Sequence, residues 1–196
     1  MVLIMKQKST GFWVVLVLIA LVCIIAFSSV SMYNSMAKAH QNVQNSKANI
    51  ETALQRRGDL IPNLVGSVKG FAAHEQGAID SVTNARAALA GAQSIEELSS
   101  ANQELSSALS RLMVIVENYP TLKADAVFIT LMDELAGSEN RISVARTDYN
   151  DAVKSYNSKL AVIPGAWFAG MFGFEPEPYF EATPESLVPP VVDFGG

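Results

Sequence analysis

The sequence predicts an all-α protein: a single N-terminal transmembrane helix, then an antiparallel four-helix bundle with long helices, then a C-terminal tail rich in proline and aromatic residues. Three observations lead to this fold class. An unbroken apolar run occupies residues 12–27, and residues 33–163 contain only two prolines and no alternating β-branched run. Within that second region, three stretches repeat apolar residues in alternating steps of three and four, which is the heptad pattern of packed helices.

Composition limits the classes of partner and ligand. The chain has 196 residues, which fits one domain of about 100–200 residues with appendages. Lys6 and Lys8 are the only charged residues among the first 32, so the rest of the chain keeps 12 of the 14 basic residues against all 19 acidic ones. This acidic body argues against nucleic acid, because phosphate binding needs a basic surface. With one cysteine, Cys23, and with His40 and His74 far apart, we expect neither a metal nor a cofactor.

A short N-terminal segment, residues 1–10, precedes the predicted transmembrane helix, residues 11–32. Its 22 residues rise about 33 Å at about 1.5 Å each, enough to cross a hydrocarbon core of about 30 Å. Trp13 and Tyr33 stand at its two ends, where amphipathic rings prefer the headgroup region. Cys23 is then a small apolar residue within the span.

A cleaved signal peptide is the alternative, with Lys6 and Lys8 as its basic start and residues 29–31 as the cleavage site. The apolar run is longer than the usual apolar core of about 7–15 residues in a signal peptide, which favours a retained anchor. The lysines before the span, weighed against Lys38 and Lys47 after it, slightly favour an N-terminus inside the cell and a body outside.

Four predicted helices make up the body, residues 33–163. The Gly58–Asp59 pair supplies a helix-ending glycine and the N-cap of the next helix, with Pro62 tolerated in its first turn. Residues 94–97 (Ser-Ile-Glu-Glu) form a capping box, and Pro120 disfavours helix at the residue before it. The predicted helices cover residues 33–57, 60–90, 95–118 and 122–163.

Short connections make neighbouring helices antiparallel, which predicts a four-helix bundle. The fourth predicted helix has about 42 residues against roughly 25–30 in the others. It must therefore extend past the bundle or break near Gly137.

Arg56 and Arg57 precede the predicted helix end at Gly58, where basic side chains interact favourably with terminal carbonyls. The alternative is an anion-binding site formed by these arginines and the N-terminus of the next helix.

Glu75 falls on the apolar stripe of the second predicted helix, where a carboxylate is costly unless it is paired. We expect a structural ion pair with Arg146, or else with Arg141, on the fourth helix. General acid–base catalysis by Glu75 is the alternative, although no nucleophile accompanies it.

Two Tyr-Asn pairs, Tyr149-Asn150 and Tyr156-Asn157, are seven residues apart and so face the same direction on one helix. Tyrosine fills a bundle core while its hydroxyl finds a partner, and buried asparagine fixes helix register. We expect these pairs to specify the bundle register; ligand binding is the alternative.

The tail, residues 164–196, holds six of the eight prolines and seven aromatic residues. Disordered segments are poor in aromatic residues, so this tail is expected to dock. One interpretation places Trp167, Phe168, Phe172 and Phe174 in the membrane interface, because the fourth helix returns toward the bilayer. The other has these rings cover the open end of the bundle core.

Together these segments resemble the LemA family of bacterial membrane-anchored helical proteins. The resemblance departs slightly at Ser138 and at Ala126-Val127. It implies one membrane span and an antiparallel helical bundle, and it implies no particular activity. The matching stretches are residues 56–75 (RRGDLIPNLVGSVKGFAAHE), 117–126 (ENYPTLKADA), 139–157 (ENRISVARTDYNDAVKSYN) and 164–180.

We expect a non-catalytic, single-pass scaffold or protein-interaction module of the bacterial cell envelope. We expect it in the cytoplasmic (inner) membrane, where residues 11–32 hold it in the lipid bilayer. A protein partner is expected, and the chain is compatible with a homo-oligomer. No nucleotide-binding, nucleophile-elbow or metalloprotease motif is present in the sequence. The alternatives are an enzyme with a polar site around Glu75 and Arg146, or a ligand-sensing extracytoplasmic domain.

Overall fold

The computed structural model describes residues 10–71 and 74–181, and it is all-helical over these residues. The predicted fold class is therefore confirmed. The N-terminal segment before residue 10 and the tail beyond residue 181 lie outside the described residues. The helices are α1 (Thr10–Phe71), α2 (Gln76–Gly91), α3 (Ile95–Val116), α4 (Pro120–Lys123), α5 (Ala126–Ala161) and α6 (Gly165–Phe172).

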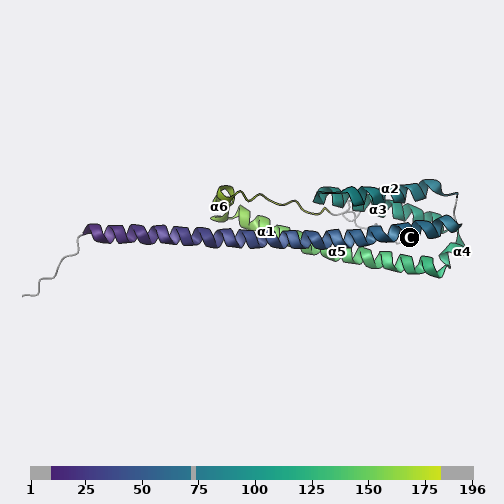
Figure 1. Cartoon of the computed structure of the whole chain (residues 1–196), viewed down its shortest axis with the longest axis horizontal. Coiled ribbons are helices and arrows are strands. Elements are labelled where there is room, and N and C mark those ends of the chain that lie inside the picture. Colours follow the sequence, from purple (N-terminus) through teal and green to yellow (C-terminus); the bar gives the residue numbers. More distant parts are fainter. Residues whose placement is uncertain (1–9, 72–73, 182–196) are drawn as a thin grey trace, which may run out of the picture.

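Helix α1 is a single helix of 62 residues that projects far beyond the rest of the molecule at its N-terminal end (Figure 1). The projecting part is apolar and exposed; Val17 and Ile24, for example, are more than 60% exposed. Among the described residues, α1 is the one helix long and apolar enough to cross a membrane. The candidate span thus continues into the bundle without a break.

The expected break at Gly58–Asp59 is wrong, because α1 runs on to Phe71. Pro62 has no N–H, so the carbonyl of Gly58, four residues earlier, loses its partner within the helix. Arg86 of α2 supplies a replacement: its Nε donates to the Gly58 carbonyl at 3.2 Å. The first helix therefore ends 14 residues later than the local signals indicate, and the second predicted helix (residues 60–90) is reduced to α2.

The buried side chains of α1 explain why packing overrides those local signals. Leu54, Ile61, Leu64 and Val68 are at most 1% exposed and follow the heptad steps straight through Pro62. Ending the helix at Gly58 would take the last three of them out of this stripe. Burial of one such side chain contributes about 1.5–3 kcal/mol, which outweighs the local preference of a Gly-Asp pair.

Helices α1 and α5 form the most extensive helix–helix contact, and the α2–α3 hairpin covers only the half of this pair farther from the span (Figure 1). Helix α5 has 36 residues and runs through Gly137 without a break, so it extends past the hairpin alongside α1. The four-helix bundle of α1, α2, α3 and α5 is thus confined to the distal half. We call the other half, nearer the candidate span, the proximal half.

The capping signals place the remaining helix ends. Ser94 Oγ accepts the Glu97 N–H at 3.1 Å, and the Glu97 carboxylate accepts the Ser94 N–H at 3.2 Å, so the predicted capping box starts α3. The expected fourth helix is divided in two: Pro120 begins α4, and the Asp125 side chain caps α5 by accepting the Phe128 N–H at 2.9 Å.

Replacing Arg86 by Met should destabilise the bundle by about 1–3 kcal/mol, because the Gly58 carbonyl is left without a donor. In a Pro62→Ala background the restored amide at position 62 satisfies that carbonyl, and the same replacement should cost less than about 1 kcal/mol. Urea unfolding of the full chain in detergent, followed by circular dichroism, measures the cycle. Arg111→Met, at an exposed position of α3, is the matched control. Equal costs in the two backgrounds would refute the role of Arg86.

Candidate functional site

The C-terminal strap, defined here as residues 174–181, runs as an extended chain from α6 toward the start of α3 (Figure 1). It crosses the part of the α1–α5 pair that the α2–α3 hairpin leaves open. Pro176 and Pro178 suit an extended path, because proline fixes φ near that of polyproline II. The strap brings the tail onto the proximal half of the bundle.

Two asparagines of α5 bind the backbone of the strap on both its donor and acceptor sides. Asn150 donates to the Phe180 carbonyl at 3.0 Å and accepts the Phe180 N–H at 2.9 Å. Asn157 makes the same pair of bonds to Glu177, at 2.8 and 2.9 Å. Each side-chain amide thus bonds both the N–H and the carbonyl of one strap residue, as a neighbouring strand would.

The tyrosine hydroxyls add a second row of bonds in the same register. Tyr149 donates to the Pro178 carbonyl and Tyr156 to the Glu175 carbonyl, both at 2.9 Å. Seven residues of α5 rise about 10.5 Å, and three residues of a polyproline II chain advance about 9.3 Å. A seven-residue repeat on the helix therefore matches a three-residue repeat on the strap.

The structure gives the two Tyr-Asn pairs a partner that the sequence analysis did not predict. Both tyrosine rings are about 1% exposed and fill the core, as expected. The asparagines bond to the strap and not to another helix, so the register they set is that of the strap on α5. Sequence reasoning missed this partner, although the Glu-Pro-Glu-Pro run at residues 175–178 was the signal that could have indicated it.

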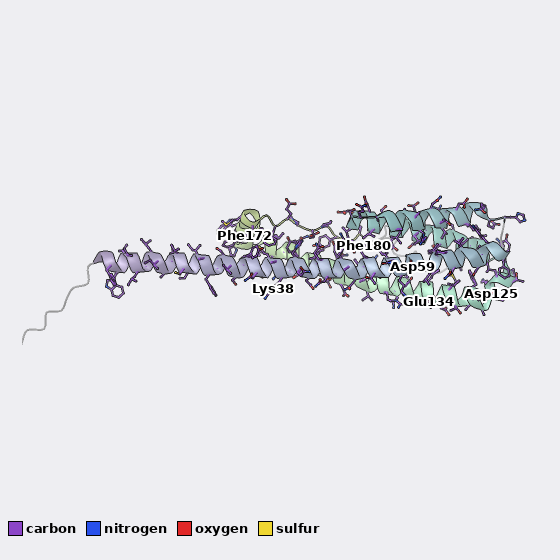
Figure 2. The ribbon with its side chains drawn as sticks, in the orientation of Figure 1. Lys38, Asp59, Asp125, Glu134, Phe172 and Phe180 are labelled. Atoms are coloured by element: carbon purple, nitrogen blue, oxygen red, sulfur yellow. The ribbon has the colours of Figure 1, made fainter. Side chains whose placement is uncertain are left out.

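Further contacts tie the strap to α1 and α3. Glu177 Oε1 lies 2.8 Å from His40 Nε2 and accepts from Gln44 at 3.1 Å, both on α1. At the far end, Phe180 is 3% exposed in the core, and Ser99 of α3 donates to the Glu181 carbonyl at 3.3 Å. Figure 2 shows Phe180 between α6 and the α2–α3 hairpin. The strap thus bridges the two halves of the molecule.

The expected Glu75–Arg146 ion pair is not formed, and this prediction is wrong. Glu75 precedes α2 instead of lying on its buried stripe, and its carboxylate accepts the Tyr119 hydroxyl at 3.2 Å. Arg146 lies about 30 Å along α5 from the end of the bundle that holds Glu75. Arg141, the second choice, donates to Gly137 of its own helix.

Arg57 is the buried charge of the distal half, only 5% exposed. Its Nη1 lies 2.7 Å from the Glu139 carboxylate and donates to Asn102 at 2.7 Å and Ser106 at 3.1 Å, which links α1, α5 and α3. Burial lowers the pKa of Arg57, and the Glu139 charge opposes that shift. The expected place of Arg57 at a helix end is wrong, because α1 continues past Gly58; the arginine instead pairs with Glu139 within the bundle.

The four aromatic residues singled out near the start of the tail divide into two groups. Phe168 and Phe174 pack against the core, as the core-covering interpretation requires. Trp167 is 68% exposed and Phe172 is 36% exposed, on a helix that contacts α1. The core-covering interpretation is thus met by Phe168 and Phe174, and a membrane-interface contact of Trp167 and Phe172 stays a prediction.

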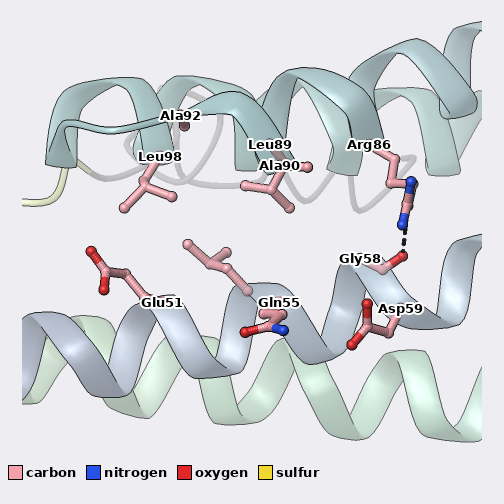
Figure 3. Close-up of a pocket in the computed structure, with 10 residues that line it drawn as sticks. Glu51, Gln55, Gly58, Asp59, Arg86, Leu89, Ala90, Ala92 and Leu98 are labelled. Carbon is pink, nitrogen blue, oxygen red and sulfur yellow. Dashed lines mark hydrogen bonds between the residues drawn. The ribbon is translucent and has the colours of Figure 1, made fainter.

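A cleft of about 410 Å³ lies between α1 and the α2–α3 hairpin (Figure 3). Its floor is apolar, with Leu54, Leu89 and Leu98, and Arg86 closes one end through its bond to Gly58. Glu75, Arg146 and the Tyr-Asn pairs do not line it. The residues proposed for an enzymatic site are thus neither together nor in this cleft.

Removing the Asn157 amide should release the central part of the strap. In Asn157→Ala the Glu177 N–H loses its acceptor, and its hydrogen exchange should speed up at least about tenfold. Residue-resolved hydrogen exchange of the full chain measures this. Asn140→Ala, at an exposed position of the same helix, should leave the rate unchanged. Unaltered exchange in Asn157→Ala would show that the strap is held by other contacts.

Alkaline pH should loosen the strap through Tyr149. Burial, with the nearby charges of Glu177 and Glu96, raises the pKa of Tyr149 to about 12 from an ordinary value of 10.0. Because the folded state favours the neutral phenol, this contribution to stability is complete below pH 10 and is lost as the pH rises toward 12. Near-ultraviolet titration of the phenolate should lose a step with a midpoint of about 12 in Tyr149→Phe. A lost step near pH 10 would contradict the buried hydrogen-bonded geometry.

Comparison with known proteins places this architecture in a family. The family model described as the LemA family matches residues 46–194. Magnetosome protein MamQ 2 of Paramagnetospirillum magneticum is 27% identical over 89% of this chain and 74% of its own length. Magnetosome protein MamQ of Magnetospirillum gryphiswaldense is 26% identical over 87% of this chain and 73% of its own length. Protein LemA of Metamycoplasma hominis is 26% identical over 79% of this chain and 73% of its own length. The matched range covers the bundle and the strap, and the chain belongs to the LemA family.

Proposed function

We propose that this chain is a non-catalytic, single-pass scaffold or protein-interaction module anchored in the cytoplasmic membrane of a bacterium. The observation that carries the proposal is the continuity of α1, which begins as an exposed apolar segment and ends as a core helix of the bundle. A partner bound to the bundle is thereby coupled to the membrane through one helix.

The dimensions of α1 suit a spacer. From Tyr33 to Phe71 the helix has 39 residues and rises about 58 Å, with α5 packed along most of that length. A lone helix of this length would bend, whereas a packed antiparallel pair resists bending. The bundle is thus held at a defined height above the lipid surface, where it presents exposed helix faces to a protein partner or to a second copy of the chain.

The polar groups that sequence reasoning singled out serve the fold. The Tyr-Asn pairs are engaged by the strap, and Arg57 is engaged by Glu139, Asn102 and Ser106. This supports a structural module over the enzyme alternative, which needs such groups to converge in an open cleft. The ligand-sensing alternative requires a cavity between helices, and the cleft in Figure 3 is the feature that favours it.

The orientation proposed is N-terminus inside and bundle outside. Lys6 and Lys8 support it through the preference for positive charge on the cytoplasmic side of a span. We also propose a second lipid contact, through exposed apolar side chains of α6 in the proximal half. Helix α6 lies against α1 near Met36, and its Trp167 and Met171 are about 70% exposed, which suits the headgroup region.

The full chain should stay in the membrane fraction after alkaline carbonate washing and keep residues 1–32. In a Cys23→Ala background, an impermeant maleimide should label Glu104→Cys in intact cells and Lys8→Cys only after permeabilisation. The Cys23→Ala chain without an added cysteine is the labelling control. Release into the wash, or an intact mass for a chain starting near Ser31, would contradict the anchor, and the reverse labelling pattern would contradict the orientation.

A further inference from the structure

A second cleft, of about 440 Å³, lies at the proximal half between α1, α5, α6 and the strap. Its volume falls within the range of about 300–1,000 Å³ that is typical of small-ligand sites. Figure 2 shows Phe172, one of its walls, on α6 beside the stretch of α1 that carries Lys38. The lining residues are Tyr33, His40, Tyr156 and the six residues from Phe172 to Glu177.

Aromatic rings form the walls of this cleft, and they are inclined to one another. The ring of Tyr33 lies 5.2 Å from that of Phe172 at 78° and 5.6 Å from that of Phe174 at 50°. On the strap-facing side, the ring of His40 lies 5.2 Å from that of Tyr156. Inclined rings around one space offer several π faces to a cation, which is the arrangement that recognises quaternary ammonium groups.

The charges of the lining are negative. Glu175 is exposed, Glu177 is about one quarter exposed, and the lining contains no lysine or arginine. The backbone of both glutamates is fixed on α5, because Tyr156 binds the Glu175 carbonyl and Asn157 binds Glu177. The strap thus holds two carboxylates beside the aromatic walls: that of Glu175 is exposed, and that of Glu177 also contacts His40 and Gln44. This combination favours an organic cation over an anion or a neutral ligand.

The position along α1 indicates the source of that cation. Tyr33 is the residue directly after the apolar span, and Gly165 at the start of α6 lies against Met36, one turn farther on. When residues 11–32 cross the bilayer, the cleft stands at the level of the lipid headgroups.

We propose that this cleft binds the ammonium group of a zwitterionic lipid headgroup, choline or ethanolamine, between the aromatic rings and the two strap carboxylates. The proposal rests on the membrane anchoring proposed above. Lipid bound there would contact α1, α6 and the strap together, so the bilayer itself would help to hold the strap in place.

Titration of tetramethylammonium into the full chain tests the chemistry. The protein is placed in nanodiscs of phosphatidylglycerol, which carries no ammonium group, at about 0.15 M salt to screen the surface charge. We expect a saturable shift of the Tyr33 ring signal in nuclear magnetic resonance. Phe172→Leu and Glu175→Gln should each weaken binding about fivefold or more, through loss of a π face or of a charge. Because Glu175 is exposed, Glu175→Gln should keep the fold. It therefore tests the site even if Phe172→Leu disturbs α6.

Matched controls separate this site from unspecific effects. Phe71→Leu removes an exposed ring at the distal end of α1, and Glu181→Gln removes a strap carboxylate outside the cleft. Both should bind tetramethylammonium like the unaltered chain. Absence of a saturable shift, or equal loss in these controls, would overturn the proposal.

A second set of discs identifies the source of the cation. In phosphatidylcholine discs the lipid headgroup should occupy the cleft, so the apparent dissociation constant for tetramethylammonium should rise at least about tenfold. The Phe172→Leu chain in both discs corrects for accumulation of the cation at the anionic surface. Equal affinity in the two lipids would overturn the assignment to lipid and point to a soluble ammonium compound. Loss of the anchor would appear in the carbonate wash, independently of this titration.

Discussion

Continuity of α1 across Pro62 is the constraint on which the other elements depend. A proline inside a helix leaves one carbonyl without its donor, and here that carbonyl, of Gly58, faces α2 and receives the Arg86 guanidinium. The helix can then pass its heptad stripe straight from Leu54 to Val68. Because α1 does not turn back at Gly58, the first reversal of the chain comes after Phe71, and the α2–α3 hairpin is correspondingly short.

Because the α2–α3 hairpin is short, part of the α1–α5 pair is left for the tail to cover. Helices α1 and α5 are both long, so their proximal halves would leave Met36 and Tyr156 facing solvent on the side where no hairpin lies. Helix α6 and the strap cover that side, and Phe180 fills the junction with the distal bundle. The strap has no regular secondary structure of its own, so its backbone depends on side chains of α5 for hydrogen bonds.

Much of the fold followed from local signals in the sequence. The apolar span, the heptad stripes and the Ser94–Glu97 capping box each depend on residues close together in the chain, and each is present. The predicted helix break at Gly58–Asp59 is wrong because the Gly58 carbonyl is satisfied by Arg86, which lies 28 residues later in the chain. The predicted burial of Glu75 is wrong for a related reason: because α1 ends later, Glu75 lies at the start of α2 and not on a buried stripe.

The site was predictable only in part. The spacing of Tyr149-Asn150 and Tyr156-Asn157 correctly indicated one shared face, but their partners lie 19 to 30 residues later in a segment without periodicity. A match between a seven-residue helical repeat and a three-residue extended repeat becomes visible only when both backbones are in place. The clefts also arise from tertiary packing, since the walls of the first come from three helices and those of the second from three helices and the strap.

The distance between the two ends of the α1 stalk tests this account most directly. Spin labels at Lys38→Cys and Lys69→Cys, both exposed positions, in a Cys23→Ala chain reconstituted in lipid, report it by pulsed electron–electron resonance. An unbroken helix across these 31 residue steps predicts a narrow distribution centred at about 46 Å before the label length is added. A chain that reverses at Gly58 would give a distance of roughly a third of that value, and such a result would contradict the continuous helix that joins the bundle to the candidate span.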